Sequence, residues 1–293
     1  MGQTAQYDLS IVILNYNSQF WLKKTLDSLK KYYLDKSKFK VEVIVVDNAS
    51  SDDSVKMTKR EFKWAKLIVN PTNCGFAAGN NVALKDASAR YVMLLNNDIQ
   101  FTEQSNLDIL IKFMDKHKEV AVISPKVVLT NGQLDQACHR GEPTPWASLA
   151  YFLKLDKLFP TNPTFGQYHM SYKDLNSPHV IDACTGAAMI IRTKIMQKVG
   201  LLDEQFFMYA EDLDWCKRFR DAGHTIVFYP EVQIIHHKYK SGIKSKSKTV
   251  ASKTKIYFYD TMLQYYDKHY RAKYPSIFRA LLKAFLFIKK EGF

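Results

Sequence analysis

The stretch Tyr91-Val-Met-Leu-Leu-Asn96-Asn97-Asp98-Ile99 decides the fold, because a run of β-forming apolar residues ends abruptly on three polar side chains. Such a run predicts a buried, central strand of a parallel sheet. In open α/β sheets, ligands bind beyond the carboxyl ends of the strands. Asp98 therefore stands where a ligand would bind, although an Asn-Asn-Asp sequence after a strand is also typical of an ordinary turn.

Further strands of the same kind precede this one and alternate with helical patterns. They are expected at residues 9–14, 41–46 and 67–69. Polar clusters follow the first two, and the third leads into a segment with two glycines, Gly75 and Gly79. This alternation predicts an α/β protein with a parallel, doubly wound sheet.

Composition excludes several classes of protein. The chain has 293 residues, of which 46% are hydrophobic and 24% charged, enough for one large domain or one domain with an appendage. Its four cysteines are scattered without metal-like pairing, and the N-terminus lacks a signal-peptide pattern. No apolar run approaches the roughly 18 residues that span a bilayer. These features indicate a cytoplasmic protein that does not cross a membrane.

The net charge of +13 calls for an anionic partner or a solvated basic loop. Nucleic acid, an anionic membrane surface and a phosphorylated substrate are the alternatives that charge alone leaves open. Lysines crowd into residues 238–255 and the C-terminal segment. No basic-aromatic nucleic-acid motif accompanies them, so we expect no nucleic-acid partner.

The strand-end clusters together outline a nucleotide pocket. Asp47 can accept from the imino N–H of a pyrimidine base, a glycine at Gly75 lets backbone approach a ligand, and Asn80 and Asn81 offer neutral donors. A tight connection between elements would equally explain the glycines. Neither the phosphate-loop motif nor the dinucleotide fingerprint is present, so a diphosphate would need a metal ion.

Five strings occur in a fixed order: SIVILNYN from Ser10, VIVVDNASSDDS from Val43, NCGFAAGNN from Asn73, LLNNDI from Leu94 and FFMYAEDLDWCKRF from Phe206. Together they resemble glycosyltransferases of family 2, in particular the rhamnosyltransferase-like branch that builds bacterial surface polysaccharides. The resemblance implies a GT-A fold, with a Rossmann-like, mostly parallel sheet flanked by helices. We therefore expect this domain over residues 1–237, its nucleotide-binding part at about 8–100 and its acceptor and catalytic part at about 101–237. A basic loop and C-terminal helices would occupy 238–293.

Site roles carry over by the same resemblance. Asp98 would hold the metal, with Asn96 standing where an aspartate is common, and Asp212 would be the general base that activates the acceptor. His236 would complete a Mn²⁺ (or Mg²⁺) site, since imidazole suits manganese. The nucleotide sugar would contact Leu14, Tyr16, Asp47, Gly75, Asn80, Asn81, Asn97 and Asp98. Gly186, Glu211 and Trp215 would lie near the donor or acceptor sugar.

The resemblance implies inverting transfer of one sugar from a nucleoside diphosphate sugar to a glycan or lipid-linked glycan. Transfer of a single sugar is favoured because no QxxRW-like processivity signature is present. dTDP-rhamnose is the favoured donor, and UDP-activated galactose, glucose, N-acetylhexosamine or galactofuranose is the alternative. A different class, a degenerate binding or scaffold protein, is kept open by Asn96.

Two segments give weaker signals. Residues 130–178 contain many aromatic residues without a clear period, as expected of a lid, an acceptor surface or plain core. The tail predicts two helices around Pro275, the second carrying an apolar stripe of Phe278, Leu281, Leu282 and Phe285 among basic residues. This stripe would either lie on the anionic inner face of the membrane or pack on the domain or on a second subunit as a homodimer.

Overall fold

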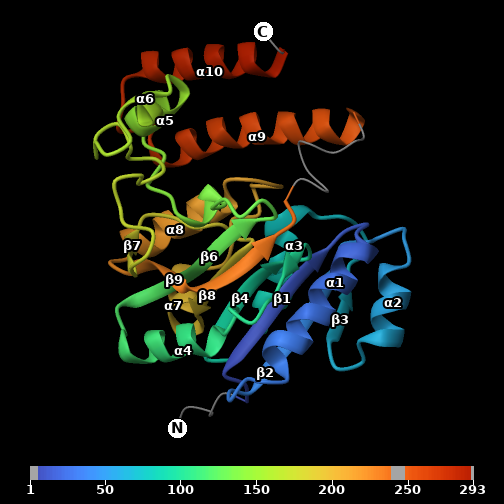
Figure 1. Cartoon of the computed structure of the whole chain (residues 1–293). Helices are drawn as coiled ribbons and strands as arrows, with labels where there is room; N and C mark the ends of the chain where they lie inside the picture. The colour runs from blue at the N-terminus through green and yellow to red at the C-terminus, as the bar shows by residue number, and fades with distance from the viewer. Residues whose placement is uncertain (1–5, 239–247, 292–293) are drawn as a thin grey trace.

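The computed structural model describes residues 6–238 and 248–291, and its centre is a single sheet (Figure 1). The four predicted N-terminal strands all form and run parallel. They are β1 (Leu9–Asn15), β2 (Val41–Asp47), β3 (Lys66–Val69) and β4 (Tyr91–Asn96). Nearly all residues of β1 and β4 are buried, because helices cover both faces of the sheet.

The second half of the sheet is mixed. The strand order is β3-β2-β1-β4-β8-β6-β9-β5, with β7 added on β9. β8 (Ala188–Arg192) is antiparallel to β4 and to β6 (Val120–Leu129), whereas β6 and β9 (Thr225–His236) are parallel. The short strands β5 (Ile99–Gln100) and β7 (His179–Ile181) both pair antiparallel with β9.

Two strands of this half are irregular. The segment 181–191 is divided between the end of β7 and β8, and the Thr185-Gly186 corner lies between them. β9 passes through Pro230 and continues to His236. Three residues of β9 bulge out between the partners of Pro125 and Lys126, and a proline without an N–H is tolerated at such a bulge.

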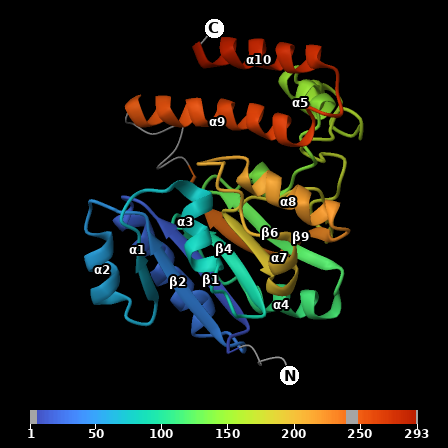
Figure 2. The same ribbon diagram turned by 180° about the vertical axis from the view of Figure 1, so that it is seen from behind.

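Helices pack on both faces of the sheet. α1 (Gln19–Leu29), extended by η1 (Lys30–Leu34), lies on the face seen in Figure 1. α3 (Gly75–Leu84), α7 (Thr193–Val199) and α8 (Glu211–Asp221) lie on the face seen in Figure 2. The remaining helices around the sheet are α2 (Ser54–Glu61) and α4 (Leu107–Lys116).

The aromatic middle segment forms short helices, the first of which packs beside β6. They are η2 (Gln136–Cys138), α5 (Pro145–Phe152) and α6 (Leu155–Leu158), and α5 lies beside the last helix of the chain (Figures 1 and 2).

The two predicted C-terminal helices are present as α9 (Lys248–His269) and α10 (Ser276–Glu291). α9 begins at Lys248, so residues 248–255 of the lysine-rich stretch are helical, and residues 239–247 lie outside the described part. Asp214 on α8 is completely buried and holds α9 by ion pairs with Lys268 at 2.6 Å and His269 at 2.7 Å. It also pairs with Arg218, one helical turn further along α8, at 2.8 Å. No helix in residues 6–238 or 248–291 is both long and apolar enough to cross a bilayer.

The stripe predicted on α10 is divided between two faces. The ring of Phe285 packs at a tilt against that of Phe152 of α5, with ring centroids 4.7 Å apart, and Leu282 packs against the tyrosine cluster of α9. Phe278 and Leu281 are exposed. The helix is thus docked on the domain by one face, which the hydrophobic period alone could not specify.

Candidate active site

The polar ends of β1, β2 and β4 meet at one edge of the sheet. The register places Asn15 opposite Asp47 and Leu14 opposite Asn96. Asn15 donates to Oδ2 of Asp47 at 2.9 Å and accepts from Nδ2 of Asn97 at 2.8 Å. Oδ1 of Asp47 accepts from the backbone N–H of Ser50 at 2.8 Å. These side chains form one network, as the strand-end clusters predicted.

Asp98 follows directly on this network and faces the end of β9. Its Oδ1 lies 3.1 Å from Nε2 of His236, and the backbone N–H of His237 donates to its carbonyl at 2.9 Å. The other ring nitrogen of His236 lies 2.9 Å from Oδ2 of Asp135, whose Oδ1 is 2.7 Å from Nζ of Lys238. All three carboxylate and imidazole groups of Asp98, His236 and Asp135 are buried.

Asp98, His236, Asp135 and Lys238 form a row of ionisable side chains. Burial opposes a charged imidazole, but its two carboxylate partners prevail and raise the pKa of His236 to about 9. Burial likewise opposes ionisation of Asp135, yet His236 and Lys238 hold the pKa of that carboxyl well below its usual range. His236 is therefore protonated at neutral pH and Asp135 is ionised, so the two form a charged pair.

The pair Asp98 and His236 has the donor set and spacing of a partial metal site. Neighbouring ligands in an octahedral site lie about 3 Å apart when each is about 2.1 Å from the ion. Oδ1 of Asp98 is buried and has no hydrogen-bond partner among residues 6–238 and 248–291, although His236 lies at ion-pair distance. A bound cation would satisfy that oxygen. No group of three His, Cys, Asp or Glu side chains suited to a metal occurs in the described ranges, so further ligands would come from the donor or from water.

Asp212 lies in the first turn of α8, and two groups donate to its Oδ2. Its Oδ2 accepts from Nη2 of Arg140 at 2.8 Å and from the backbone N–H of Gly186 at 3.3 Å. The same arginine nitrogen donates to the carbonyl of Cys184 at 3.0 Å. Burial opposes the charge of the guanidinium, but the Asp212 carboxylate raises the pKa of Arg140. Arg140 was not singled out from sequence, because nothing in the aperiodic segment around it distinguishes it.

The segment around Gly186 joins Asp212 to the strand-end network. The backbone N–H of Asn96 donates to the carbonyl of Ala187 at 2.9 Å, one residue after the Gly186 N–H that binds Asp212. A Cβ on Gly186 would lie 3.1 Å from the ring of Phe76, so a larger residue would displace this corner. The candidate base and the Asn96–Asp98 turn therefore share one edge of the sheet.

Glu211 is buried beside Asp212, and no group in the described part of the chain forms a hydrogen bond with its Oε2. Loss of hydration and the neighbouring Asp212 carboxylate raise the pKa of Glu211 to about 8. The residues just before it, Tyr209 and Ala210, have positive φ angles of 73° and 65°. Two successive non-glycine residues in this region are strained, and such strain is typical of functional sites. Packing of Ala210 against the tyrosines of α9 holds this turn in place.

Several residues that were predicted to contact the nucleotide sugar make contacts within the protein. A Cβ on Gly75, which has φ of +86°, would lie 2.4 Å from the carbonyl of Phe207, so backbone approach within the protein accounts for this glycine. Asn80 donates to the carbonyl of Phe76 at 2.9 Å, and Asn81 donates to that of Leu202 at 2.9 Å. Both side chains are buried, and these donor groups form bonds within the protein.

Trp215 also belongs to the core. Its indole is completely buried and donates to the carbonyl of Gly200 at 2.8 Å, so it does not face a sugar in this structure. Leu14 packs against Gly79, while Tyr16 is half exposed just beyond β1. Of the predicted nucleotide contacts, Tyr16 is thus the side chain most open to solvent.

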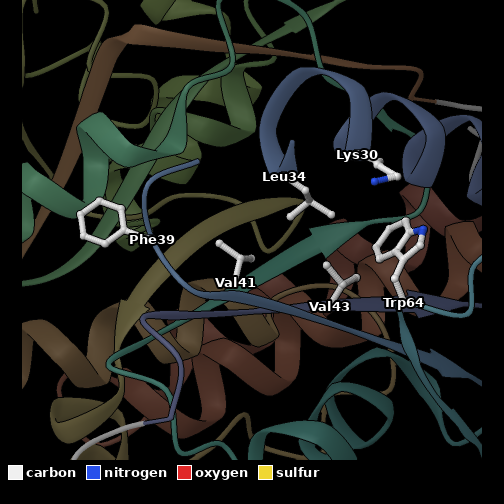
Figure 3. Close-up of a pocket in the computed structure, with 6 residues that line it drawn as sticks. All are labelled: Lys30, Leu34, Phe39, Val41, Val43 and Trp64. Carbon is white, nitrogen blue, oxygen red and sulfur yellow. The ribbon is translucent and has the colours of Figure 1, made fainter. Parts of the chain in front are cut away.

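A cavity of about 260 Å³ lies elsewhere, near the start of β2 (Figure 3). It is lined by Lys30, Leu34, Phe39, Val41, Val43 and Trp64. Because Val41 opens β2 and Asp47 ends it, this cavity is at the opposite edge of the sheet from the polar network. It carries none of the candidate site residues.

A mixed α/β sheet with carboxylates, amides and a histidine along the strand ends agrees with the GT-A fold that the motifs imply. The family model described as glycosyl transferase family 2 matches residues 10–198. The chain belongs to that family, and the family and fold predicted from the motifs are confirmed.

Its relatives include enzymes of glycan biosynthesis. The chain is 26% identical over 241 residues to the low-salt glycan biosynthesis hexosyltransferase Agl10 of Haloferax volcanii, covering 80% of this chain and 69% of that protein. It is 22% identical over 241 residues to an N-acetylglucosaminyl-diphospho-decaprenol L-rhamnosyltransferase of Mycobacterium tuberculosis, covering 78% and 76%. The chain is thus a glycosyltransferase related to hexosyl- and rhamnosyltransferases.

Solved structures support the fold. GalNAc-T7, crystallised with UDP, GalNAc and Mn²⁺, matches with a TM-score of 0.59 and 16% identity. The match covers 78% of this chain and 44% of that one, so the chain spans less than half of that protein's length. At this identity the likeness establishes the fold alone.

Proposed function

We propose that this glycosyltransferase moves a single sugar from a nucleoside diphosphate sugar to a hydroxyl of a glycan or lipid-linked glycan, with inversion. The observation that carries the proposal is the position of Asp212. It is a carboxylate oriented by Arg140 and Gly186 at the same sheet edge as Asp98 and His236. The general base and the residues that would hold the diphosphate through a metal ion would therefore face the same reaction centre.

The residues would divide the work as follows. The Asp212 carboxylate takes the proton from the acceptor hydroxyl as the acceptor oxygen forms a bond to the anomeric carbon. The bond between that carbon and the diphosphate oxygen breaks on the opposite face, and the diphosphate leaves with the electron pair. Arg140 keeps the carboxylate aligned through a bond that involves only Oδ2. Oδ1, which accepts from the backbone N–H of Leu213 at 2.7 Å, keeps a second lone pair.

The donor would lie along the strand-end network. Asp47, Asn97 and Tyr16 would contact the nucleotide, and Leu14 would support them from β1. Asp98 and His236 would hold Mn²⁺ or Mg²⁺, replacing the proton that the imidazole carries in the ion pair. When bound, such an ion would supply positive charge against the diphosphate. Gly186 and Glu211 would border the sugar.

dTDP-rhamnose is the favoured donor, supported by the activity named for the mycobacterial relative. A UDP-activated hexose, N-acetylhexosamine or galactofuranose is the alternative. The acceptor would belong to cell-surface polysaccharide synthesis on the cytoplasmic side of the membrane. A degenerate scaffold is disfavoured, because a protein without transfer activity has no need of a buried ion pair at Asp212, and such a pair is expensive to keep.

A donor screen tests the proposal. The full chain is incubated with a panel of dTDP-, UDP- and GDP-sugars in Mn²⁺ and a lipid-linked N-acetylglucosamine acceptor, and products are identified by mass spectrometry. Transfer of one residue from one donor, with inverted anomeric configuration by NMR, is expected. A product chain of repeated sugars, or retention of configuration, would contradict it.

A further inference from the structure

We propose that the end of the molecule formed by α5, α6 and α10 docks on the surface of an anionic lipid bilayer. Figures 1 and 2 show α10 at one end of the molecule, with α9 between it and the sheet and α5 at its side. The contact between the rings of Phe152 and Phe285 confirms that the two segments touch. The proposal does not depend on sugar transfer, because neither segment carries a residue assigned to the reaction.

The first observation is the outward face of α10. Ile277, Leu281, Phe287 and Ile288 are between 50% and 64% exposed. At 3.6 residues per turn they fall on one side of the helix, together with the exposed Ala280 and Ala284. The inward side, which includes Leu282 and Leu286, packs on the domain. α10 is therefore apolar on the face that points away from the protein as well as on the face that holds it.

The second observation is a matching face on the neighbouring segment. Trp146, Leu149 and Leu153 follow helical spacing on α5 and its last turn, and each is at least 43% exposed. Leu158 and Phe159 continue the exposed apolar surface past α6. We call the exposed apolar residues of both segments the α5–α10 surface. Exposed apolar residues gathered on two adjoining helices are typical of a membrane or protein contact.

The charges around the α5–α10 surface favour an anionic lipid bilayer over a protein as its partner. Lys283 and Lys289 flank the apolar face of α10 on opposite sides, and Lys154 and Lys157 are exposed on the α5–α6 segment. Within residues 145–160 and 276–290 the one acidic residue is Asp156, which is buried against His169. A two-fold contact with a second copy would bring lysines against lysines. An anionic lipid surface complements them, and this combination is typical of interfacial helices.

Co-sedimentation of the full chain with vesicles tests the proposal. We expect binding to phosphatidylcholine vesicles that contain phosphatidylglycerol, weaker binding to phosphatidylcholine alone, and release from the anionic vesicles as salt rises. If the chain binds neither kind of vesicle, the proposal is wrong.

Paired variants locate the contact. Leu281→Glu/Ile288→Glu on α10 and Leu149→Glu/Leu153→Glu on α5 should each lower the vesicle partition coefficient at least about tenfold, since they place charge in the apolar face. Val180→Glu is the matched control, because Val180 is equally exposed but lies on β7. Equal binding by all three proteins would refute the assignment of this surface.

The charge contribution is tested in the same way. Lys283→Glu/Lys289→Glu should weaken binding to anionic vesicles about tenfold or more, whereas Lys59→Glu/Lys63→Glu, with the same change in net charge on the exposed surface near α2, should have a smaller effect. Equal effects of both pairs would show that vesicle binding depends only on the net charge of the protein. The α5–α10 surface would then not be the site of lipid contact.

The variant Trp146→Phe tests lipid contact without a change that would impair vesicle binding through misfolding. This variant keeps an apolar side chain, so it should still bind vesicles but lose the vesicle-induced change in tryptophan emission. An unchanged emission response would place Trp146 away from the lipid. Sedimentation velocity without lipid completes the test: a wild-type dimer that Leu281→Glu/Ile288→Glu converts to monomer, without vesicle binding by the wild type, would overturn the proposal in favour of self-association.

Discussion

Nη2 of Arg140 donates to Oδ2 of Asp212 at 2.8 Å, and the two residues are 72 positions apart in the chain. Both side chains are largely buried, with 11% and 13% of their surfaces exposed. A buried pair of this kind depends on both partners, because removing one leaves an uncompensated charge. Arg140 is therefore a positioning residue for the proposed base.

Replacing the proposed base should abolish transfer and spare binding. Asp212→Asn removes the proton acceptor but keeps the shape of the side chain, so kcat should fall about 10²–10⁴-fold. Nucleotide affinity by calorimetry should stay within about twofold, because the base acts on the acceptor. Asp27→Asn, an exposed change on α1, should leave both values unchanged. Near-normal turnover by Asp212→Asn would remove Asp212 from this role.

The coupling between Arg140 and Asp212 can be measured as stability. Arg140→Gln alone should destabilise the fold by about 3 kcal/mol or more, because Asp212 would lose its buried counter-charge. In a double-mutant cycle with Asp212→Asn, urea unfolding should give a coupling energy of about 1–3 kcal/mol. Additive effects would mean that the two side chains act independently.

The metal pair should control nucleotide binding in Mn²⁺. Asp98→Ala should weaken Mn²⁺-dependent binding of nucleoside diphosphate more than about tenfold, and His236→Ala should weaken it less, because a carboxylate carries charge as well as a donor atom. His237→Gln is the matched control one residue along. Titration calorimetry with and without Mn²⁺ distinguishes these cases, and unchanged affinity in both alanine variants would exclude this site.

Glu211 should make the stability of the free enzyme fall with rising pH. The pKa of Glu211 is raised from 4.5 to about 8 in the folded protein, so the folded state holds a proton that the unfolded chain releases between these values. The stabilising contribution is complete below pH 4.5 and is lost as pH rises through about 8. Glu211→Gln should remove this part of the slope. Urea unfolding should show that the free energy of unfolding of the variant, relative to that of the wild type, is higher at pH 9 than at pH 6. If this difference is the same at both pH values, the pKa shift of Glu211 is contradicted.

The attachment of α9 should depend on Asp214. Asp214→Asn leaves Lys268 and Arg218 without their buried carboxylate, and we expect a loss of about 3 kcal/mol or more in unfolding free energy. Asp203 also pairs with Lys268 at 2.6 Å but nearer the surface, so Asp203→Asn should cost less than about 1 kcal/mol. Thermal unfolding of the two variants side by side checks the difference. Similar losses would show that Asp214 is not the principal anchor.

The sequence alone was sufficient for the parallel half of the sheet and for the family. β1, β2 and β4 are continuous apolar runs that end on polar residues, and local pattern specifies both the strands and the edge at which Asn15, Asp47 and Asp98 gather. The i,i+4 pair of Asp214 and Arg218 was also predictable, because it depends only on helix geometry.

The partners of these residues were decided by tertiary structure. Arg140 meets Asp212 and Asp135 meets His236 only because β6, β9 and α8 pack together, and no local period reports a contact across 72 or 101 residues. The same holds for the internal bonds of Asn81 and the burial of Trp215. On α10, the periodicity indicated an apolar helix, but which apolar residues face the domain and which face outward depends on the position of α9 and α5. A hydrophobic pattern records that a side chain avoids water, and only the packed fold specifies what covers it.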